Sequence, residues 1–329
     1  MKRSRSAILV GILGFAALQL GLSRSIESDA LPVRDPIYTE KLALLRKHSE
    51  FWRETSERPR ILALGSSRTQ LLIDAKRLEP DARAFNFGCS SCGPIAQLLY
   101  LRRLIGAGVR ADVLLIEVHP ALLAELPEPF EWRWLHPHRL RPGEGDVLRD
   151  FGCPTEPSAT ADCHWLHASS HYRFALLNEY APGLLPGSRA IRRNRASDDF
   201  GYVTSIDAAP ALRAQLTPNA NEEYRSAFAD YRPGGPTVLA LRRMVELGLA
   251  HSMRPVLFVG PESTEFRRWY GAAGNARFAE FLDRFTLELA VPLHASRDWL
   301  RDDEFADGHH ATPRGAQIFT DRIAGELGR

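Results

Sequence analysis

The chain has 329 residues, enough for one large α/β domain with an insertion. Apolar residues make up 44% and charged residues 25%, a balance typical of globular proteins that argues against disorder, collagen-like repeats or many membrane spans. The net charge is +2 with acids and bases intermixed, so no nucleic-acid partner is expected, and the basic cluster at 189–195 is interpreted as solvated surface.

The N-terminus predicts a membrane segment. The basic stretch MKRSRS precedes residues 7–22, sixteen residues without a charged side chain. This run is slightly short for a bilayer span of about 17–25 residues and long for the core of a signal peptide, about 7–15 residues. Because no clear cleavage site follows, residues 1–24 are predicted to be an uncleaved signal anchor, with a cleaved signal peptide as the alternative. Either interpretation places the rest of the chain on the extracytoplasmic side, membrane-anchored in the first case.

A change of pattern after residue 58 predicts where the main domain begins. Residues 25–58 are expected to be a linker with a packing helix, since apolar residues recur at helical spacing between 38 and 54. Strands then alternate with helices through 59–329, which predicts an α/β domain with a parallel sheet. Strands are expected at 60–67, 83–88, 112–120, 254–261 and 291–296. Helices are expected at 94–108, 237–252, 275–290 and 313–327.

Residues 121–235 interrupt this alternation. They are rich in Pro and Gly, carry several Trp residues and have poor periodicity, so they are predicted to form a long insertion after the third strand. The sheet is therefore expected to have about five parallel strands divided by that insertion.

The predicted strand ends bring polar residues together. In open α/β sheets, ligands bind beyond the carboxyl ends of the strands. Five segments lie just past those ends and should share one rim of the sheet: 65–68, 88–93, 117–119, 260–262 and the segment leading to 307–310.

Two of these segments suggest nucleophilic catalysis. A serine after Gly65 would project from the end of the first strand, although Gly-Ser-Ser after a strand is by itself more often a turn and a helix cap. Asp307 and His310 lie three residues apart on a loop that enters a helix at Pro313. A serine becomes nucleophilic when a histidine accepts its proton, and that histidine needs an acceptor that fixes its tautomer. The alternative is a solvated loop without chemistry.

The order GSS, NFGCSSCGP, IEVHP and DGHHATPRG resembles the SGNH/GDSL hydrolase superfamily. Within it, the chain is most similar to the membrane-anchored branch that handles acyl groups on cell-envelope polymers, which includes D-alanyl-transfer and alginate O-acetylation relatives. The resemblance covers about 59–120 and 254–325 and leaves the insertion uncovered. It implies a flavodoxin-like three-layer α/β/α fold.

The resemblance also implies the site residues. Carried over position by position, the catalytic residues are Ser67, Asp307 and His310, and His309 falls on an unconstrained position. The oxyanion or substrate-binding positions are Gly88, Ser91 and His119. Two positions depart from the family pattern: Ser91 stands where glycine is usual, and His119 stands near the usual asparagine.

The implied activity is that of an extracytoplasmic serine esterase or O-acyltransferase. Its substrate would be an acylated polysaccharide or another ester, and no cofactor or metal is required. The alternative is a non-catalytic binding or assembly partner of a membrane-bound O-acyltransferase. For that binding role, five aromatic residues could supply a glycan-stacking surface, although aromatic residues more often belong to the core: Trp132, Trp134, Trp165, Tyr172 and Trp269.

The cysteines allow other interpretations. Cys153 and Cys163, ten residues apart in a loop-like stretch, are a possible disulfide in an oxidising compartment. Cys89 and Cys92 form a C-x-x-C motif, but it lacks the preceding Trp of thiol oxidoreductases, so a local disulfide or two thiols is preferred.

A metal site remains a further alternative. It would use Asp307, His309 and His310 with His294 or the Cys163-His164 pair, yet no HExxH or paired CxxC spacing supports it.

Overall fold

The computed structural model describes residues 2–28, 30–31, 33–48, 58–133, 135, 139–141, 143–153, 168–185 and 197–327. The chain forms two compact units. One consists of Met1–Glu40 with Leu135–Asn194, and the other of Lys41–Trp134 with Arg195–Arg329. The second unit contains the sheet and every residue predicted for the catalytic and oxyanion positions.

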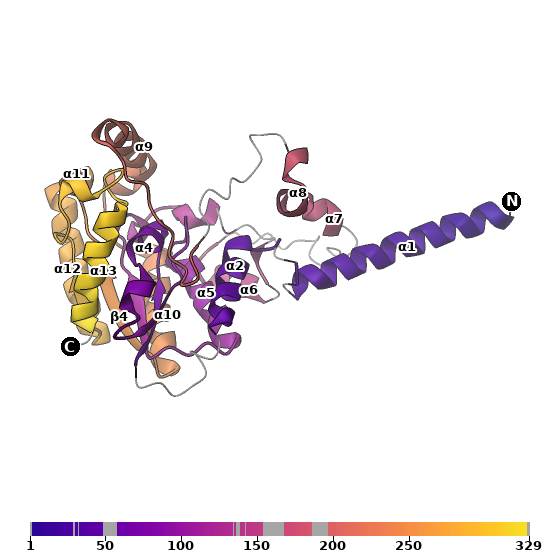
Figure 1. Ribbon diagram of the computed structural model, residues 1–329, viewed down its shortest axis with the longest axis horizontal. Coiled ribbons are helices and arrows are strands. Elements are labelled where there is room, and N and C mark those ends of the chain that lie inside the picture. The colour runs from indigo at the N-terminus through magenta and orange to yellow at the C-terminus, as the bar shows by residue number, and fades with distance from the viewer. Residues whose placement is uncertain are drawn as a thin grey trace. The chain divides into compact units, whose positions relative to one another are not determined.

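A five-stranded parallel sheet forms the centre of this second unit (Figure 1). Its strands are β1 (Arg60–Leu64), β2 (Arg83–Asn86), β3 (Val113–Glu117), β4 (Arg254–Val259) and β5 (Leu293–Ala295). Their order is β2-β1-β3-β4-β5, the flavodoxin-like order of doubly wound sheets. The prediction of about five parallel strands is therefore confirmed. All five residues of β3 are buried, as a central strand covered on both faces requires.

Helices cover both faces of the sheet. The helical elements that alternate with the strands or follow them are α4 (Ser67–Leu72), η1 (Ala75–Leu78), α5 (Pro94–Gly106), α10 (Gly235–Ala250), α11 (Thr264–Trp269), α12 (Gly271–Leu289), η7 (Asp302–Glu304) and α13 (Pro313–Leu327). Alternate strand residues such as Leu115 and Phe258 pack in one core with Phe319 of α13. On the opposite face, Gly248 of α10 lies so close to Leu114 that an added Cβ would be 3.1 Å from its side chain.

The segment between β3 and β4 is long, as predicted, but it is more helical than its sequence suggests. It contains η2 (Pro120–Leu123), η3 (Phe130–Arg133), α6 (Glu144–Asp150), α7 (Ala168–His171), α8 (Arg173–Tyr180), η6 (Pro182–Leu184) and α9 (Pro210–Phe228), followed by α10. Helix α9 packs against α11 (Figure 1). It was not predicted, because Pro218 interrupts its sequence and apolar residues do not form a clear stripe.

The first unit contains α1 (Lys2–Glu27), one uninterrupted helix (Figure 1). Its segment Ser6–Glu27 is long and apolar enough to cross a membrane, with a mean hydropathy of 1.9. The predicted apolar N-terminal helix is thus confirmed. The predicted packing helix is α2 (Pro36–Lys47), which begins slightly earlier than expected, while residues 49–57 lie outside the described part.

Removing side-chain volume from the central strand should destabilise the protein. Leu115 has no solvent exposure, so Leu115→Ala should lower the free energy of unfolding by about 2–5 kcal/mol through lost burial and a residual cavity. The matched control is Leu287→Ala on α12, whose side chain is 84% exposed. Denaturant unfolding of the full chain in detergent measures both. Equal stability of the two variants would contradict the assignment of Leu115 to the core.

Candidate active site

Ser67 lies on a tight turn that joins β1 to α4. Ser66 is the N-cap of α4, and its side chain accepts a hydrogen bond from the Arg68 amide at 3.2 Å. A Cβ at Gly65 would lie 1.8 Å from Thr69 Oγ1, so only glycine fits there. The turn leaves Ser67 partly exposed at the start of the helix, beyond the carboxyl end of β1.

Glu117 anchors this turn to the neighbouring strand. It is the last residue of β3, and its buried carboxylate Oε2 accepts hydrogen bonds from the Ser66 amide at 2.6 Å and from Thr69 Oγ1 at 2.8 Å. Glu117 lies on the predicted rim, but its sequence position had indicated no role for it. An acidic residue at the end of an otherwise apolar strand was the available signal, since a buried carboxylate must have hydrogen-bond donors.

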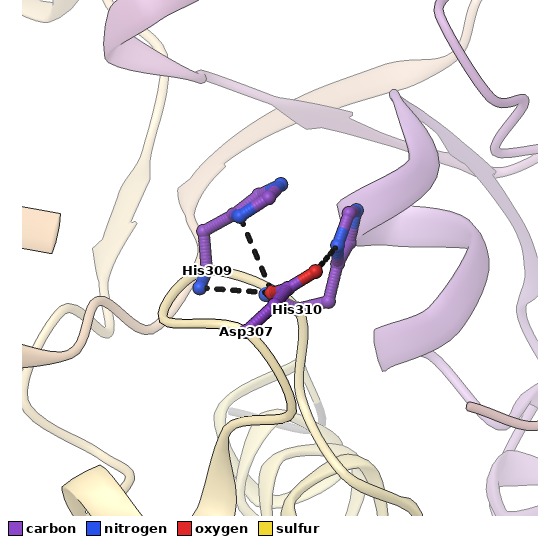
Figure 2. Close-up of side chains that lie close together, drawn as sticks. All are labelled: Asp307, His309 and His310. Carbon is purple, nitrogen blue, oxygen red and sulfur yellow. Dashed lines mark hydrogen bonds and ion pairs between the residues drawn. The ribbon is translucent and has the colours of Figure 1, made fainter. Parts of the chain in front are cut away.

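Asp307 and His310 meet Ser67 across the rim. His310 Nε2 lies 2.8 Å from Ser67 Oγ, and His310 Nδ1 lies 2.7 Å from Asp307 Oδ2. Figure 2 shows the Asp307–His310 pair on its loop. Because the carboxylate accepts the Nδ1 proton, Nε2 is left as the acceptor for the serine hydroxyl. The residues brought together are therefore a serine, a base and an acid in the arrangement that activates a nucleophile.

The local backbone fixes the acid relative to the base. Gly308 turns the loop with φ of 92°, a conformation that glycine adopts without strain. This turn lets Asp307 Oδ1 accept a hydrogen bond from the His310 amide at 2.9 Å while Oδ2 faces the ring. Burial raises the pKa of the Asp307 carboxyl, but the neighbouring His309 and His310 lower it more, so that the pKa lies below its usual value. The acid is therefore ionised at neutral pH.

His309 was predicted to be unconstrained, but the structure places it inside the site. It is 3% exposed, and its ring centroid lies 3.8 Å from that of His310. Its Nδ1 is 3.3 Å from Asp307 Oδ1. Burial, with His310 and Arg68 adding to it, holds the pKa of His309 well below its usual value. The spacing from Asp307 distinguished His310 from His309, but it could not show that His309 is buried beside the same carboxylate.

His119 presents an unused hydrogen-bond donor. Its Nδ1 accepts a hydrogen bond from the Ala121 amide at 3.1 Å, so in the neutral ring Nε2 carries the proton. Burial, Arg68 and the neighbouring histidines hold the pKa of His119 well below its usual value, which keeps the ring neutral. Within the part of the chain that the structure describes, the buried Nε2 has no hydrogen-bond partner. A buried donor without a partner is unusual and suits an acceptor supplied by a ligand.

The loop after β2 is held by hydrogen bonds to its neighbours. The Gly88 amide, at one of the predicted oxyanion or substrate-binding positions, donates to Asn86 Oδ1 at 2.8 Å. Gly88 also allows close approach, because a Cβ there would lie 2.5 Å from the Gln70 amide nitrogen. Asn86 Nδ2 in turn donates to the carbonyls of Thr69 at 2.8 Å and Ile73 at 2.7 Å. This loop is thus tied directly to the helix that carries Ser67.

Ser91 adopts a backbone conformation suited to glycine. Its φ is 61°, in the left-handed region that non-glycine residues rarely occupy. Glycine was expected at this position from the family resemblance, and the backbone of Ser91 does adopt the left-handed conformation that glycine favours. The structure leaves Ser91 as a candidate backbone donor.

The cysteines near this loop are buried. Cys89 is a free thiol whose Sγ donates to the Phe87 carbonyl at 3.3 Å, and the Cys92 amide closes a turn to the Cys89 carbonyl at 3.2 Å. The loop is therefore held by hydrogen bonds and not by a Cys89–Cys92 bridge. The predicted pair Cys153–Cys163 includes a residue outside the described part of the chain.

The predicted aromatic surface is only partly described. Trp134 and Trp165 lie outside the described residues. Trp132 and Tyr172 are half-buried and belong to different units. Trp269 borders the acid–base loop, because a Cβ at Gly308 would lie 3.5 Å from its ring.

A cation could compete for the acid–base loop. One ligand atom each of Asp307, His309 and His310 lies within 4.8 Å of the others. The His310 Nδ1 and an Asp307 oxygen already bond to each other, so a metal bound through these atoms would have to break that contact. The arrangement favours the acid–base pair over a resident metal.

Comparison of the chain with protein-family models and with curated proteins found no match.

Glu131 joins the segment after β3 to the loop that contains Ser91. Its carboxylate accepts hydrogen bonds from the Ile95 amide at 3.1 Å and the Ala96 amide at 2.7 Å, at the N-terminus of α5. The side chain is 2% exposed, and burial raises its pKa from 4.5 to about 7 although these amides lower it. Glu131 was not singled out by the sequence analysis.

The raised pKa of Glu131 makes stability pH-dependent. A carboxyl whose pKa is higher in the folded than in the unfolded chain favours folding below about pH 4.5, and this contribution is lost as pH rises through about 7. The free energy of unfolding of wild type should therefore fall as the pH rises from 5 to 8. The fall should exceed that of Glu131→Gln by up to about 3 kcal/mol. Denaturant unfolding at both pH values measures this, and parallel pH dependence of the two proteins would contradict it.

Proposed function

We propose that the protein is a serine esterase or O-acyltransferase that acts on ester-linked acyl groups. The observation that carries the proposal is the continuous contact from Ser67 Oγ to His310 Nε2 at 2.8 Å and from His310 Nδ1 to Asp307 Oδ2 at 2.7 Å. These distances are within the range at which a base can take the proton of a nucleophile. The resemblance to SGNH/GDSL hydrolases supports the same assignment independently of the distances.

The reaction would take place in two steps. Ser67 Oγ attacks the ester carbonyl while His310 Nε2 accepts the hydroxyl proton, and Asp307 stabilises the imidazolium that forms. The tetrahedral intermediate collapses, His310 returns the proton to the leaving alcohol, and the acyl group remains on Ser67. Water or a sugar hydroxyl then attacks the acyl-serine, again with His310 as the base, and restores free Ser67. The first acceptor gives hydrolysis and the second gives transfer.

Three donors are candidates for stabilising the oxyanion: the Ser67 amide at the start of α4, the Ser91 amide and the His119 Nε2–H. His119 is the strongest addition, because its donor is buried, neutral and without an acceptor among the described residues. Aligned donors in a desolvated site stabilise the developing negative charge without reorganisation during the reaction.

The apolar helix α1 supports a location of this chemistry at the cell envelope. An uncleaved α1 would hold the enzyme on the extracytoplasmic side, where an acylated polysaccharide or a similar ester-bearing polymer is the substrate. A membrane-bound O-acyltransferase is the proposed partner, since it could supply or receive the acyl group. No cofactor is needed, because serine, histidine and aspartate can complete both steps.

Loss of the nucleophile should abolish covalent labelling. A serine-reactive fluorophosphonate probe should label wild type, and Ser67→Ala should remove the label because Ser67 Oγ is the hydroxyl that lies against His310 Nε2. Ser66→Ala is the matched control: it removes a helix cap and about 1 kcal/mol of stability but should keep the label. Mass spectrometry of labelled peptides identifies the modified serine.

Two results would decide against this proposal. Wild type that does not react with the probe would favour a non-catalytic binding or assembly role beside an acyltransferase. Labelling that disappears in EDTA would indicate a metal at Asp307, His309 and His310, since the serine mechanism should be unaffected by chelation.

The role of His119 as a hydrogen-bond donor can be tested by comparing a substitution that removes the donor with one that replaces it by an amide N–H. His119→Leu should reduce the rate of hydrolysis of a small acetyl ester by about 100- to 1,000-fold, the usual cost of losing one oxyanion donor. His119→Asn keeps a neutral N–H donor and should be much closer to wild type. Steady-state kinetics measures both, with circular dichroism as the control for folding. Similar rates for the two variants would exclude His119 as a donor.

A further inference from the structure

We propose that His309 is a positioning residue that holds the carboxylate of Asp307 in the orientation that His310 requires. This inference rests on the proposed function, because it assigns a second histidine to the same acid–base pair. It concerns a residue to which the family pattern gives no role.

The carboxylate of Asp307 is contacted on both of its oxygens. Oδ2 faces His310 Nδ1 at 2.7 Å. Oδ1 accepts the amides of His310 at 2.9 Å and His309 at 3.3 Å, and it also lies 3.3 Å from His309 Nδ1 (Figure 2). The terminal torsion of an aspartate is soft, so the carboxylate would rotate freely unless Oδ1 were held. His309 contributes its amide as a hydrogen-bond donor to Oδ1. Its buried ring Nδ1 faces the same oxygen at 3.3 Å and has no hydrogen-bond partner among the described residues, so Asp307 is the acceptor nearest to hand when the carboxylate shifts.

The surroundings of His309 define which ring nitrogen carries the proton. Nε2 lies 3.5 Å from Tyr224 Oη, and burial raises the pKa of this tyrosine so that its hydroxyl remains protonated. A hydroxyl that donates to Nε2 leaves the proton of the neutral ring on Nδ1, the atom that faces the carboxylate. A continuous series of polar contacts then runs from Tyr224 through His309, Asp307 and His310 to Ser67.

The ring of His309 also shields the carboxylate from water. It packs between Phe266, at a centroid distance of 6.0 Å, and His310, at 3.8 Å. Tyr224 packs against its edge at 5.2 Å. Shielding strengthens the Asp307–His310 contact because charges interact more strongly at low dielectric. A neutral His309 suits this arrangement, since a charged ring so close to His310 would oppose the imidazolium formed during catalysis.

The test compares substitutions that separate hydrogen bonding from packing. The amide of His309→Asn can occupy the position of Nδ1 and still face Asp307, although it leaves a cavity. His309→Leu fills the space without a polar group, and the amide of His309→Gln reaches toward Tyr224 instead. His251→Leu, at an exposed histidine outside the site, is the matched control.

A positioning role predicts that His309→Asn retains most of the wild-type rate of fluorophosphonate labelling and of acetyl-ester hydrolysis. His309→Leu and His309→Gln should be slower by about 10- to 100-fold, the usual effect of misplacing a catalytic group. The downfield proton NMR signal of the His310–Asp307 hydrogen bond should persist in wild type and His309→Asn and weaken in the other two. Thermal unfolding shows whether each variant is folded.

The inference would be overturned if the rates of the variants ranked in the opposite order. If His309 only fills space, His309→Leu will keep the rate and the NMR signal while His309→Asn loses stability. If His309→Leu does not fold, a folded His309→Gln with the wild-type rate overturns the inference equally. Unlabelled wild type would overturn the proposed function as well, whereas labelled wild type with unaffected variants overturns the role of His309 alone.

Discussion

The hydrogen bond from the Ser66 amide to Glu117 Oε2, 2.6 Å long, is the contact on which the site depends. It joins the turn after β1 to the end of β3, the two strands that pair at the centre of the sheet. With Gly65 lacking a side chain, the carboxylate can approach the backbone closely and also bind Thr69. The orientation of Ser67 is thereby set by the rigid sheet and not by a mobile loop, which is the condition for a pre-organised nucleophile.

In the buried site, one carboxylate is charged and two of the histidines are neutral. Asp307 is ionised beside two histidines, and burial keeps His119 and His309 neutral. Neutral imidazoles can donate hydrogen bonds without opposing the positive charge that forms on His310. The buried guanidinium of Arg68 reinforces this, because it lowers the pKa of both neutral histidines while its Nη2 donates to the Pro261 carbonyl at 2.5 Å. Burial and Arg68 therefore keep His119 and His309 uncharged.

Much of the fold and the central contacts of the site followed from short-range patterns. Apolar runs ending in Gly and Ser predicted the strands, and the strand-end rule predicted that Ser67 and His310 would share a rim. Helix α9 was missed because its apolar residues have no simple period, and with it Tyr224 was missed. The hydrogen bond of the Gly88 amide to Asn86 was not foreseen, because backbone partners depend on how the loop folds. Glu131 was not singled out, because its donors belong to α5, about 35 residues earlier in the chain.

The sequence by itself determined the parallel α/β architecture, the apolar N-terminal helix and the identity of the residues at the strand ends, because these depend on periodicity and local turn chemistry. Only the tertiary structure decided which of those residues touch. The 2.8 Å contact between Ser67 and His310 joins positions 243 residues apart, and burial of His309 beside Asp307 depends on side chains from α9 and α11. Burial and hydrogen-bond partners are properties of the packed chain, so adjacent residues such as His309 and His310 acquire different environments that their spacing does not encode.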